Sequence, residues 1–352
     1  MCTRYETECD AIAAKQQLLI GDTAGFNYDA RDIVFDGDKF VVSVKDYKNI
    51  CASVKQLMKG YRVPLPVTQP WNDSTVPINP YLLGLWLGGG YSNAPVIVGC
   101  DDEIKYALES IAFSMGLTVT TTVVSVPGQV KNDVIATRST YEWTLVNSNS
   151  NKPDNSNSLT AALRAMGLIN NKHIPAVYLN ASASIRRDLL AGLLDTDGYL
   201  MHSNRSYVYE FLQSAARETL LISDTMKLAG SLGMQVSPRY LVKRSAAQLD
   251  MGMCQDDAGG HIYYQVYLGG EEMRSINTRV PRKNINMVAP DQTFYHTYCS
   301  TIQVKESSQQ QFCGIQVDGN NRFLLADATV VHNWYVMSYM YIHIYYYTTN
   351  IA

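Results

Sequence analysis

The sequence has little charge and no large excess of either sign. Charged residues make up 17% of its 352 residues, and the formal net charge at pH 7 is −3, so the composition does not indicate a basic nucleic-acid-binding protein. No apolar run reaches about 18–20 residues, which argues against a transmembrane helix. The chain also does not open on the basic and apolar regions of a secretory signal. These absences predict an intracellular protein, nuclear or cytoplasmic, without a membrane partner.

Cysteine is present, but it is not arranged for a structural role. The seven cysteines are scattered along the chain, their number is odd, and none forms a CxxC pair. This pattern argues against a disulfide scaffold and against a zinc site. It favours a reducing compartment.

The apolar fraction of 46% is high enough to exclude disorder as the main state. The length suggests two or three domains of about 100–200 residues each. Residues 1–20 predict a helix, and residues 31–47 predict a hairpin around an Asp-Gly turn. The prolines within 63–80 indicate a linker, and the polar stretch 147–158 indicates a flexible loop.

The most informative pattern is an internal repeat. An apolar segment that ends in glycine is followed by an amphipathic segment and then by an aromatic strand, and this order occurs twice. The order and the type of segment match three times, so we predict two pseudo-symmetric α/β halves on one chain. The paired segments are YLLGLWLGGGY (81–91) with LLAGLLDTDGY (189–199), SMGLTV (114–119) with SLGMQV (231–236), and YEWTLV (141–146) with IYYQVYL (262–268).

Small residues recur on one face of each apolar segment. Gly84 and Gly88 lie four residues apart, and Gly192 and Thr196 match them. Such spacing lets two helix backbones approach more closely than the usual 8–10 Å. We therefore predict that helices over 80–88 and 184–194 pack at a pseudo-two-fold axis. From spacing alone, a tight core helix pair without chemistry remains an equal alternative.

Two acids at the end of the second segment favour chemistry. Asp195 and Asp197 lie where the negative end of the helix dipole disfavours an acid. Asp195 is expected either to be solvated or to cap a neighbouring element. Asp197 is expected in the turn near the two-fold axis, where its carboxylate would need a cation. A hard divalent ion with oxygen ligands suits that place.

These motifs resemble a known family. LLAGLLDTDG resembles the LAGLIDADG motif of homing endonucleases, LLGLWLGGG resembles its first copy, and FLLADATVVHN (323–333) resembles the C-terminal splicing block of inteins. Together they resemble a fungal nuclear intein that carries a two-motif endonuclease, and YRVPLPVTQPWNDSTVPINPYLLGLWLG (61–88) most resembles inteins inserted in a spliceosomal protein. The resemblance implies an α/β (α+β) fold of two αββαββα halves with saddle-shaped sheets, and remnants of the β-rich Hint splicing domain at the ends. It also implies a monomer that cuts a specific double-stranded DNA site with Mg²⁺ (or Mn²⁺), and a host extein protein.

The resemblance assigns roles to individual residues. Asp197 matches a catalytic, metal-binding acid, whereas Gly89 stands at the position of the first acid and has no side chain to bind metal. We therefore expect Asp197 and Gly88 beside the metal, and Lys243 as a catalytic cation. We also expect Gly89→Asp to restore a ligand at little packing cost. Lys172 is expected either to contact a phosphate or to cap a helix. The expected DNA contacts are Lys172, Arg205, Arg239, Lys243 and Arg244.

The chain ends bear on splicing. His332 and Asn333 match the residues for C-terminal Asn cyclisation, but Trp334 stands where a nucleophile is required. No TxxH block is visible within 1–75, so the chain is expected not to complete splicing, either as a gene-model fragment or as a degenerate relic. The predicted regions are 1–75 as an N-terminal intein remnant, 76–296 as the endonuclease (halves 76–150 and 159–296), 297–333 as the splicing segment and 334–352 as an atypical tail.

Three functions are compatible with this sequence. The first is an intein-type endonuclease that is impaired at Gly89 and is inactive or cuts one strand. The second is a DNA-binding relic that no longer cuts. The third is an intein remnant in which only Asn cyclisation survives.

Overall fold

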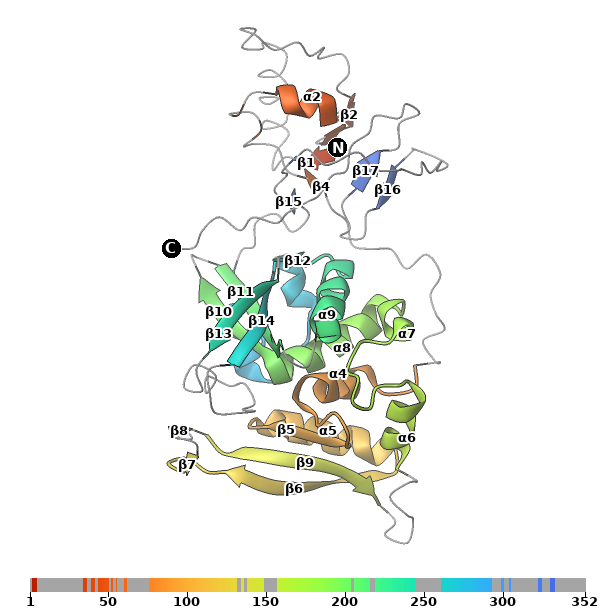
Figure 1. Ribbon diagram of the computed structural model, residues 1–352, viewed down its shortest axis with the longest axis vertical. Helices are drawn as coiled ribbons and strands as arrows, with labels where there is room; N and C mark the ends of the chain where they lie inside the picture. Colours follow the sequence, from red (N-terminus) through yellow and green to blue (C-terminus); the bar gives the residue numbers. More distant parts are fainter. Residues whose placement is uncertain are drawn as a thin grey trace. The chain divides into compact units, whose positions relative to one another are not determined.

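The structure is a computed structural model, and its chain divides into two compact units, residues 66–294 and residues 1–65 together with 295–352 (Figure 1). Among the described residues no helix combines the length and apolarity that a membrane crossing requires. The described residues are 2–4, 34–36, 39–41, 44–50, 52, 55, 60–61, 76–131, 134–135, 138–148, 157–203, 206–215, 219–237, 239–244, 261–292, 299–300, 304, 322–324 and 330–332.

The unit formed by the chain ends contains short antiparallel strands in the part that is described. The predicted hairpin is confirmed at its turn, because β2 and β3 pair with Asp36 opposite Lys39, but residues 44–47, which were expected to belong to it, begin a helix instead. The helix predicted over 1–20 is wrong at residues 2–4, which form a strand paired with β3; the rest of that segment lies outside the described residues. The elements are β1 (Cys2–Arg4), β2 (Val34–Asp36), β3 (Lys39–Val41), α2 (Val44–Asn49), β4 (Gly60–Tyr61), β15 (Cys299–Ser300), β16 (Arg322–Leu324) and β17 (Val330–His332).

The larger unit contains two halves whose helices and strands follow a related order. The first half contains α4 (Pro80–Gly89), β5 (Val96–Gly99), α5 (Asp102–Ser114), β6 (Leu117–Ser125), β7 (Val130–Lys131), β8 (Val134–Ile135), β9 (Thr140–Asn147) and α6 (Ser158–Ala165). After α7 (Ala176–Leu179), the second half contains α8 (Ala183–Asp197), β10 (Gly198–Ser203), β11 (Ser206–Ser214), α9 (Thr219–Ser231), β12 (Gln235–Val236), β13 (Tyr240–Arg244) and β14 (His261–Gly269). It closes with η4 (Glu271–Ser275), η5 (Pro281–Lys283) and α11 (Ile285–Val288).

The two sheets are antiparallel and share one strand order. The second sheet runs β10-β11-β14-β12, with β13 also paired to β14. The first runs β5-β9-β6, and the strand that would match β10 is reduced to a bridge between Gly90 and Ile97. The sheets flank the helix pair α4 and α8 on opposite sides (Figure 1). The predicted class, α+β with two related halves, is confirmed; in the second half short 3₁₀ turns and α11 replace a long closing helix.

Local sequence explains where the two central helices begin and end. The Asn79 side chain accepts a hydrogen bond from Leu82 N–H (3.1 Å), and Pro80 occupies the first turn, where a missing N–H costs nothing. The Ser182 hydroxyl accepts one from Ile185 N–H (3.4 Å). Both helices end at a glycine in extended conformation, Gly90 and Gly198.

The helices cross with their backbones in contact. A Cβ added at Gly84 would overlap the Leu189 carbonyl oxygen and lie 3.0 Å from Gly192 Cα, and one added at Gly192 would overlap the Tyr81 carbonyl oxygen and lie 3.0 Å from Gly84 Cα. The same shift of 108 positions relates each residue to its counterpart (84 to 192, 81 to 189). This equality confirms the predicted pseudo-two-fold axis and the internal repeat.

We expect Gly84→Ala to lower the free energy of unfolding by about 2–3 kcal/mol, because the backbones must separate to admit a methyl group. Urea unfolding measures this loss. Gly116→Ala is the matched control: it has open space but a φ of +68°, so only a backbone cost of about 1 kcal/mol is expected. Equal losses in the two variants would contradict a backbone contact at Gly84.

Candidate functional site

The C-terminal ends of α4 and α8 meet at the two-fold axis and form the candidate site. Gly88 lies against Thr196, its counterpart, so closely that a Cβ at Gly88 would overlap the Thr196 hydroxyl. The same Cβ would lie 3.4 Å from the Asp197 carboxyl carbon. The Thr196 hydroxyl is buried and donates back to carbonyls of its own helix. The last acid of α8 is therefore presented next to the end of α4, as the sequence predicts.

Asp197 is half-buried, and its carboxylate accepts a hydrogen bond from the Gln213 side-chain amide. Gln213 is brought there by register, because β11 runs back past the helix end with Phe211 opposite Gly198. Sequence reasoning missed Gln213. The sequence signal for it is weak, because the strand SYVYEFLQS also contains other polar residues, Glu210 among them.

The first half has no counterpart of this pair. Gly89 corresponds to Asp197, and the Gly90–Ile97 bridge makes Gly99 the counterpart of Gln213. A Cβ at Gly99 would lie 2.5 Å from Cζ3 of Trp143, whose buried ring fills that space. The first half therefore has neither the acid nor its amide partner, and the Trp143 ring occupies the space that the amide side chain would need.

The expected low packing cost of Gly89→Asp is wrong. Gly89 is buried, and a Cβ there would lie 2.9 Å from the Val98 carbonyl oxygen and 3.1 Å from Thr196 Cγ2. The backbone oxygen cannot move aside as a flexible side chain can. A carboxylate at 89 would therefore disturb β5 as well as the helix end.

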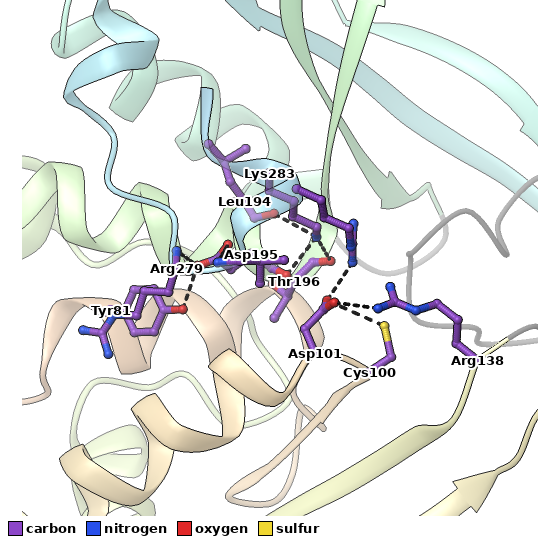
Figure 2. A network of polar contacts seen from close by, with 11 residues as sticks. Tyr81, Cys100, Asp101, Arg138, Leu194, Asp195, Thr196, Arg279 and Lys283 are labelled. Atoms are coloured by element: carbon purple, nitrogen blue, oxygen red, sulfur yellow. Dashed lines mark hydrogen bonds and ion pairs between the residues drawn. The ribbon is translucent and has the colours of Figure 1, made fainter. Parts of the chain in front are cut away.

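Two lysines neutralise the two helix ends. The Lys283 ammonium donates to the carbonyls of Leu194 (3.1 Å), Asp195 (2.8 Å) and Thr196 (3.2 Å), and its side chain is 1% exposed (Figure 2). Lys172 donates to the Gly90 carbonyl (2.6 Å) and, weakly, to that of Gly88 (3.4 Å). A cation is favoured at the negative end of a helix dipole.

These contacts decide between the two roles expected of Lys172. It is buried and caps α4, with its ammonium also 5.4 Å from the Trp86 ring centre, so its place does not support the predicted DNA contact. Sequence reasoning missed Lys283, although RKNI (282–285) repeats the pattern of NKHI (171–174). That similarity was the available signal.

Asp195 is buried and bonded, and the expectation that it could be solvated is wrong. Its carboxylate accepts hydrogen bonds from the Tyr81 hydroxyl (2.7 Å), Arg279 N–H (2.7 Å) and Val280 N–H (3.3 Å). Burial raises the pKa of Asp195, while these donors and Lys283 act in the opposite direction. Asp195 therefore fixes the segment that carries Lys283 onto α8, which is the capping role expected as its alternative.

A buried carboxylate joins the two halves beside the helix ends. Asp101, which precedes α5, pairs with Arg282 of the second half (2.6 Å) and with Arg138 (3.0 Å). Figure 2 shows Asp101 between Arg138 and the Lys283 segment. No sequence pattern pointed to this contact, which spans 181 positions.

The donor set at the site fits one hard cation rather than two. Among the described residues no group of three or more His, Cys, Asp or Glu side chains is placed to hold a metal. The Gly88 carbonyl, an expected metal neighbour, faces the Lys172 ammonium, which repels a cation. One carboxylate supplemented by water and substrate phosphate is nevertheless a normal Mg²⁺ arrangement, and Asp197 offers it.

The other predicted DNA contacts are placed unevenly. Arg205 lies outside the described residues. Lys243 and Arg244 lie on β13, opposite Ile262 and His261. Arg239 is exposed, with its guanidinium 4.2 Å from the Tyr264 ring centre.

The outer face of the first sheet, turned away from the helices, carries no cation among the described strands. By register its side chains are Val96, Val98, Thr118, Thr120, Thr122, Glu142, Thr144 and Val146.

The residues predicted for splicing are only partly described. The β17 strand ends at His332, opposite Arg322 of β16, and Asn333 lies outside the described residues.

Comparison with known proteins gives partial matches. No family model matches the sequence. A segment of 156 residues is 33% identical to the replicative DNA helicase DnaB of Mycobacterium intracellulare, and the match covers 44% of this chain and 19% of that protein. The chain thus spans under a fifth of that relative's length. Among solved structures it is similar to mesophilic variants of the homing endonuclease I-DmoI, with a TM-score of 0.31 and 11% identity over 54% of this chain and 87% of that one.

We expect Lys283→Met to lower the free energy of unfolding by about 2–4 kcal/mol, because it removes a buried ammonium that donates to three helix-end carbonyls, of which that of Leu194 also accepts from Gly198 N–H. Lys172→Met serves as the matched variant and should cost less, about 1–2 kcal/mol, since that ammonium has one short carbonyl contact. Chemical denaturation measures both. A Lys283 variant as stable as the wild type would contradict the capping role.

Proposed function

We propose that the protein is a two-motif, site-specific DNA endonuclease of the homing type, with one working centre that cuts one DNA strand. One observation carries this proposal. Asp197 and Gln213 form a polar pair beside the two-fold axis, whereas Gly89 and Gly99 replace both members in the other half. The LAGLIDADG-like second motif supports the assignment to this class, and the host would be a longer protein into which the chain is inserted.

The second half supplies the groups that such chemistry needs. Asp197 would hold one Mg²⁺ (or Mn²⁺), which when bound supplies an activated water and charge stabilisation at the phosphate. Gln213 orients the Asp197 carboxylate through its hydrogen bond. Lys283 offsets the negative helix end, so the carboxylate is not also opposed by an uncompensated dipole.

DNA contact is proposed to depend mainly on the second half. Arg205, Arg239, Lys243 and Arg244 remain the proposed cations, and Lys243 a proposed catalytic cation. The outer face of the first sheet presents threonine hydroxyls, which can form hydrogen bonds to DNA phosphates and so position the DNA backbone. Hydroxyls carry no positive charge, so they do not displace the cations that surround DNA. We therefore expect a shallower salt dependence than two equally basic halves would give.

Helicase activity is not proposed. The sequence contains no Gly-Lys pair, and so it lacks the phosphate-binding loop that couples NTP hydrolysis to such motors. The alternative is a DNA-binding relic of this class that no longer cuts. The two hypotheses differ in whether Asp197 supports cleavage, because a relic would bind a site without nicking it.

The test is selection of a binding site from a randomised duplex library, followed by incubation of a supercoiled plasmid bearing that site with Mg²⁺. We expect nicked circles, with little linear product, because a single acid is available. Asp197→Asn should reduce nicking by about 100-fold or more, as loss of a key electrostatic group does, while binding persists. Gly89→Asp should not produce linear DNA.

Binding without any nicking would favour the relic. Linear product from the wild type would contradict the single-centre proposal. Ser110→Ala changes an exposed residue on α5. It is the control for the effect of a surface substitution, and it should nick DNA like the wild type.

A second candidate activity concerns the chain end. The β16–β17 hairpin ends at His332, next to Asn333, and we propose that this pair supports slow Asn cyclisation with cleavage after residue 333. Ligation is not expected, because Trp334 offers no nucleophile. Prolonged incubation followed by mass spectrometry should show loss of residues 334–352, and Asn333→Ala should abolish the loss. An unchanged mass with the fold intact would contradict the proposal.

A further inference from the structure

The strand β6 forms an edge of the first sheet. Within the described parts of the chain it pairs with β9 alone, so no described strand covers its other side. Residues 117–123 pair without irregularity, and a bulge follows between Val123 and Ser125. A regular edge strand presents N–H and C=O groups that can pair with another strand.

The β6 strand lacks the features that normally protect such an edge. Its sequence, LTVTTTVVS, contains no charged residue and no proline. Natural edge strands are usually blocked by lysine, proline or an early bulge. Threonine and valine instead favour strand pairing, so the strand is suited to accept a partner.

We propose that β6 pairs antiparallel with β6 of a second copy of this chain, and so forms a symmetric dimer. Pairing centred on Thr120 uses the whole regular run. It places Thr118 opposite Thr122 and Thr120 opposite itself, and cross-strand threonine pairs stabilise a sheet. Such a contact uses the same patch on both copies, so it closes as a dimer.

Exposed apolar side chains at the two ends of β6 also favour a second copy as the partner. Phe113 is 85% exposed, and it comes just before the turn at Gly116 that leads into β6. Val123, at the other end of the run, is 56% exposed and shares the sheet face of Trp143. The centred register brings the Val123 end of one copy to the Phe113 end of the other, twice by symmetry.

A second copy fits better than a peptide partner. The edge of β6 carries no charge, and exposed apolar side chains, Phe113 and Val123, lie at its two ends. In the two-fold register each of these ends faces the opposite end of the other copy. A charged peptide would find no complementary charge on β6. The dimer replaces the monomer expected from the sequence, and it does not depend on the proposed nuclease activity.

Sedimentation equilibrium of the full chain tests the proposal. We expect a concentration-dependent dimer for the wild type. Thr120→Lys and Thr120→Glu should each be monomeric, because like charges would face each other across the axis. An equal mixture of the two variants should recover the dimer, which only a register near Thr120 predicts.

Leu220→Lys provides the matched control. It also introduces a lysine at an exposed site, on α9 of the second half, and it should remain dimeric. Circular dichroism should show all variants folded. A wild type that stays monomeric at every concentration, a dimer unaffected by Thr120→Lys, or an open-ended series of larger species would each overturn the proposal.

Discussion

The contact between the backbones of α4 and α8 is the constraint on which the rest of the molecule depends. No side chain fits between Gly84 and Gly192, so the helices come closer than ordinary helices do. That closeness brings their C-terminal ends together at the two-fold axis. It thereby fixes where Asp197 and the two capping lysines must lie.

Convergence of two C-terminal ends creates an electrostatic problem. Each end carries partial negative charge, and α8 adds Asp195 and Asp197. One lysine caps each end: Lys172 follows the last helix of the first half, and Lys283 lies in η5, near the end of the second half. Burying an ammonium is costly unless its hydrogen bonds are made, and Lys283 makes three to carbonyls. The lysines are therefore part of the condition under which these ends can meet.

The sequence predicted what depends on local pattern. Helix spacing, the Asn79 and Ser182 caps and the order of the repeats lie within short windows, so the helix pair and the two halves could be anticipated. The Asp101–Arg282 pair joins residues 181 positions apart, and no short window contains it. The packing around Gly89 was misjudged for the same reason: the Val98 carbonyl that crowds it belongs to another element. The motif predicted a missing acid at Gly89, but it could not show that Trp143 fills the place of the amide partner.

The asymmetry of the two halves extends beyond a single position. A single lost acid would leave its amide partner and an open space, because neighbours in a packed core relax only partly. Here both polar positions are glycine, and a tryptophan ring and a strand carbonyl occupy the space. In the proposed function the metal is held in the second half alone, so the first half would not need to hold a phosphate close to its helix end. The outer face of its sheet, which carries no cation among the described strands, and the uncharged edge strand β6 agree with this. The two-fold framework thus serves the packing of both halves, while the polar pair of Asp197 and Gln213 has no counterpart at Gly89 and Gly99 in the first half.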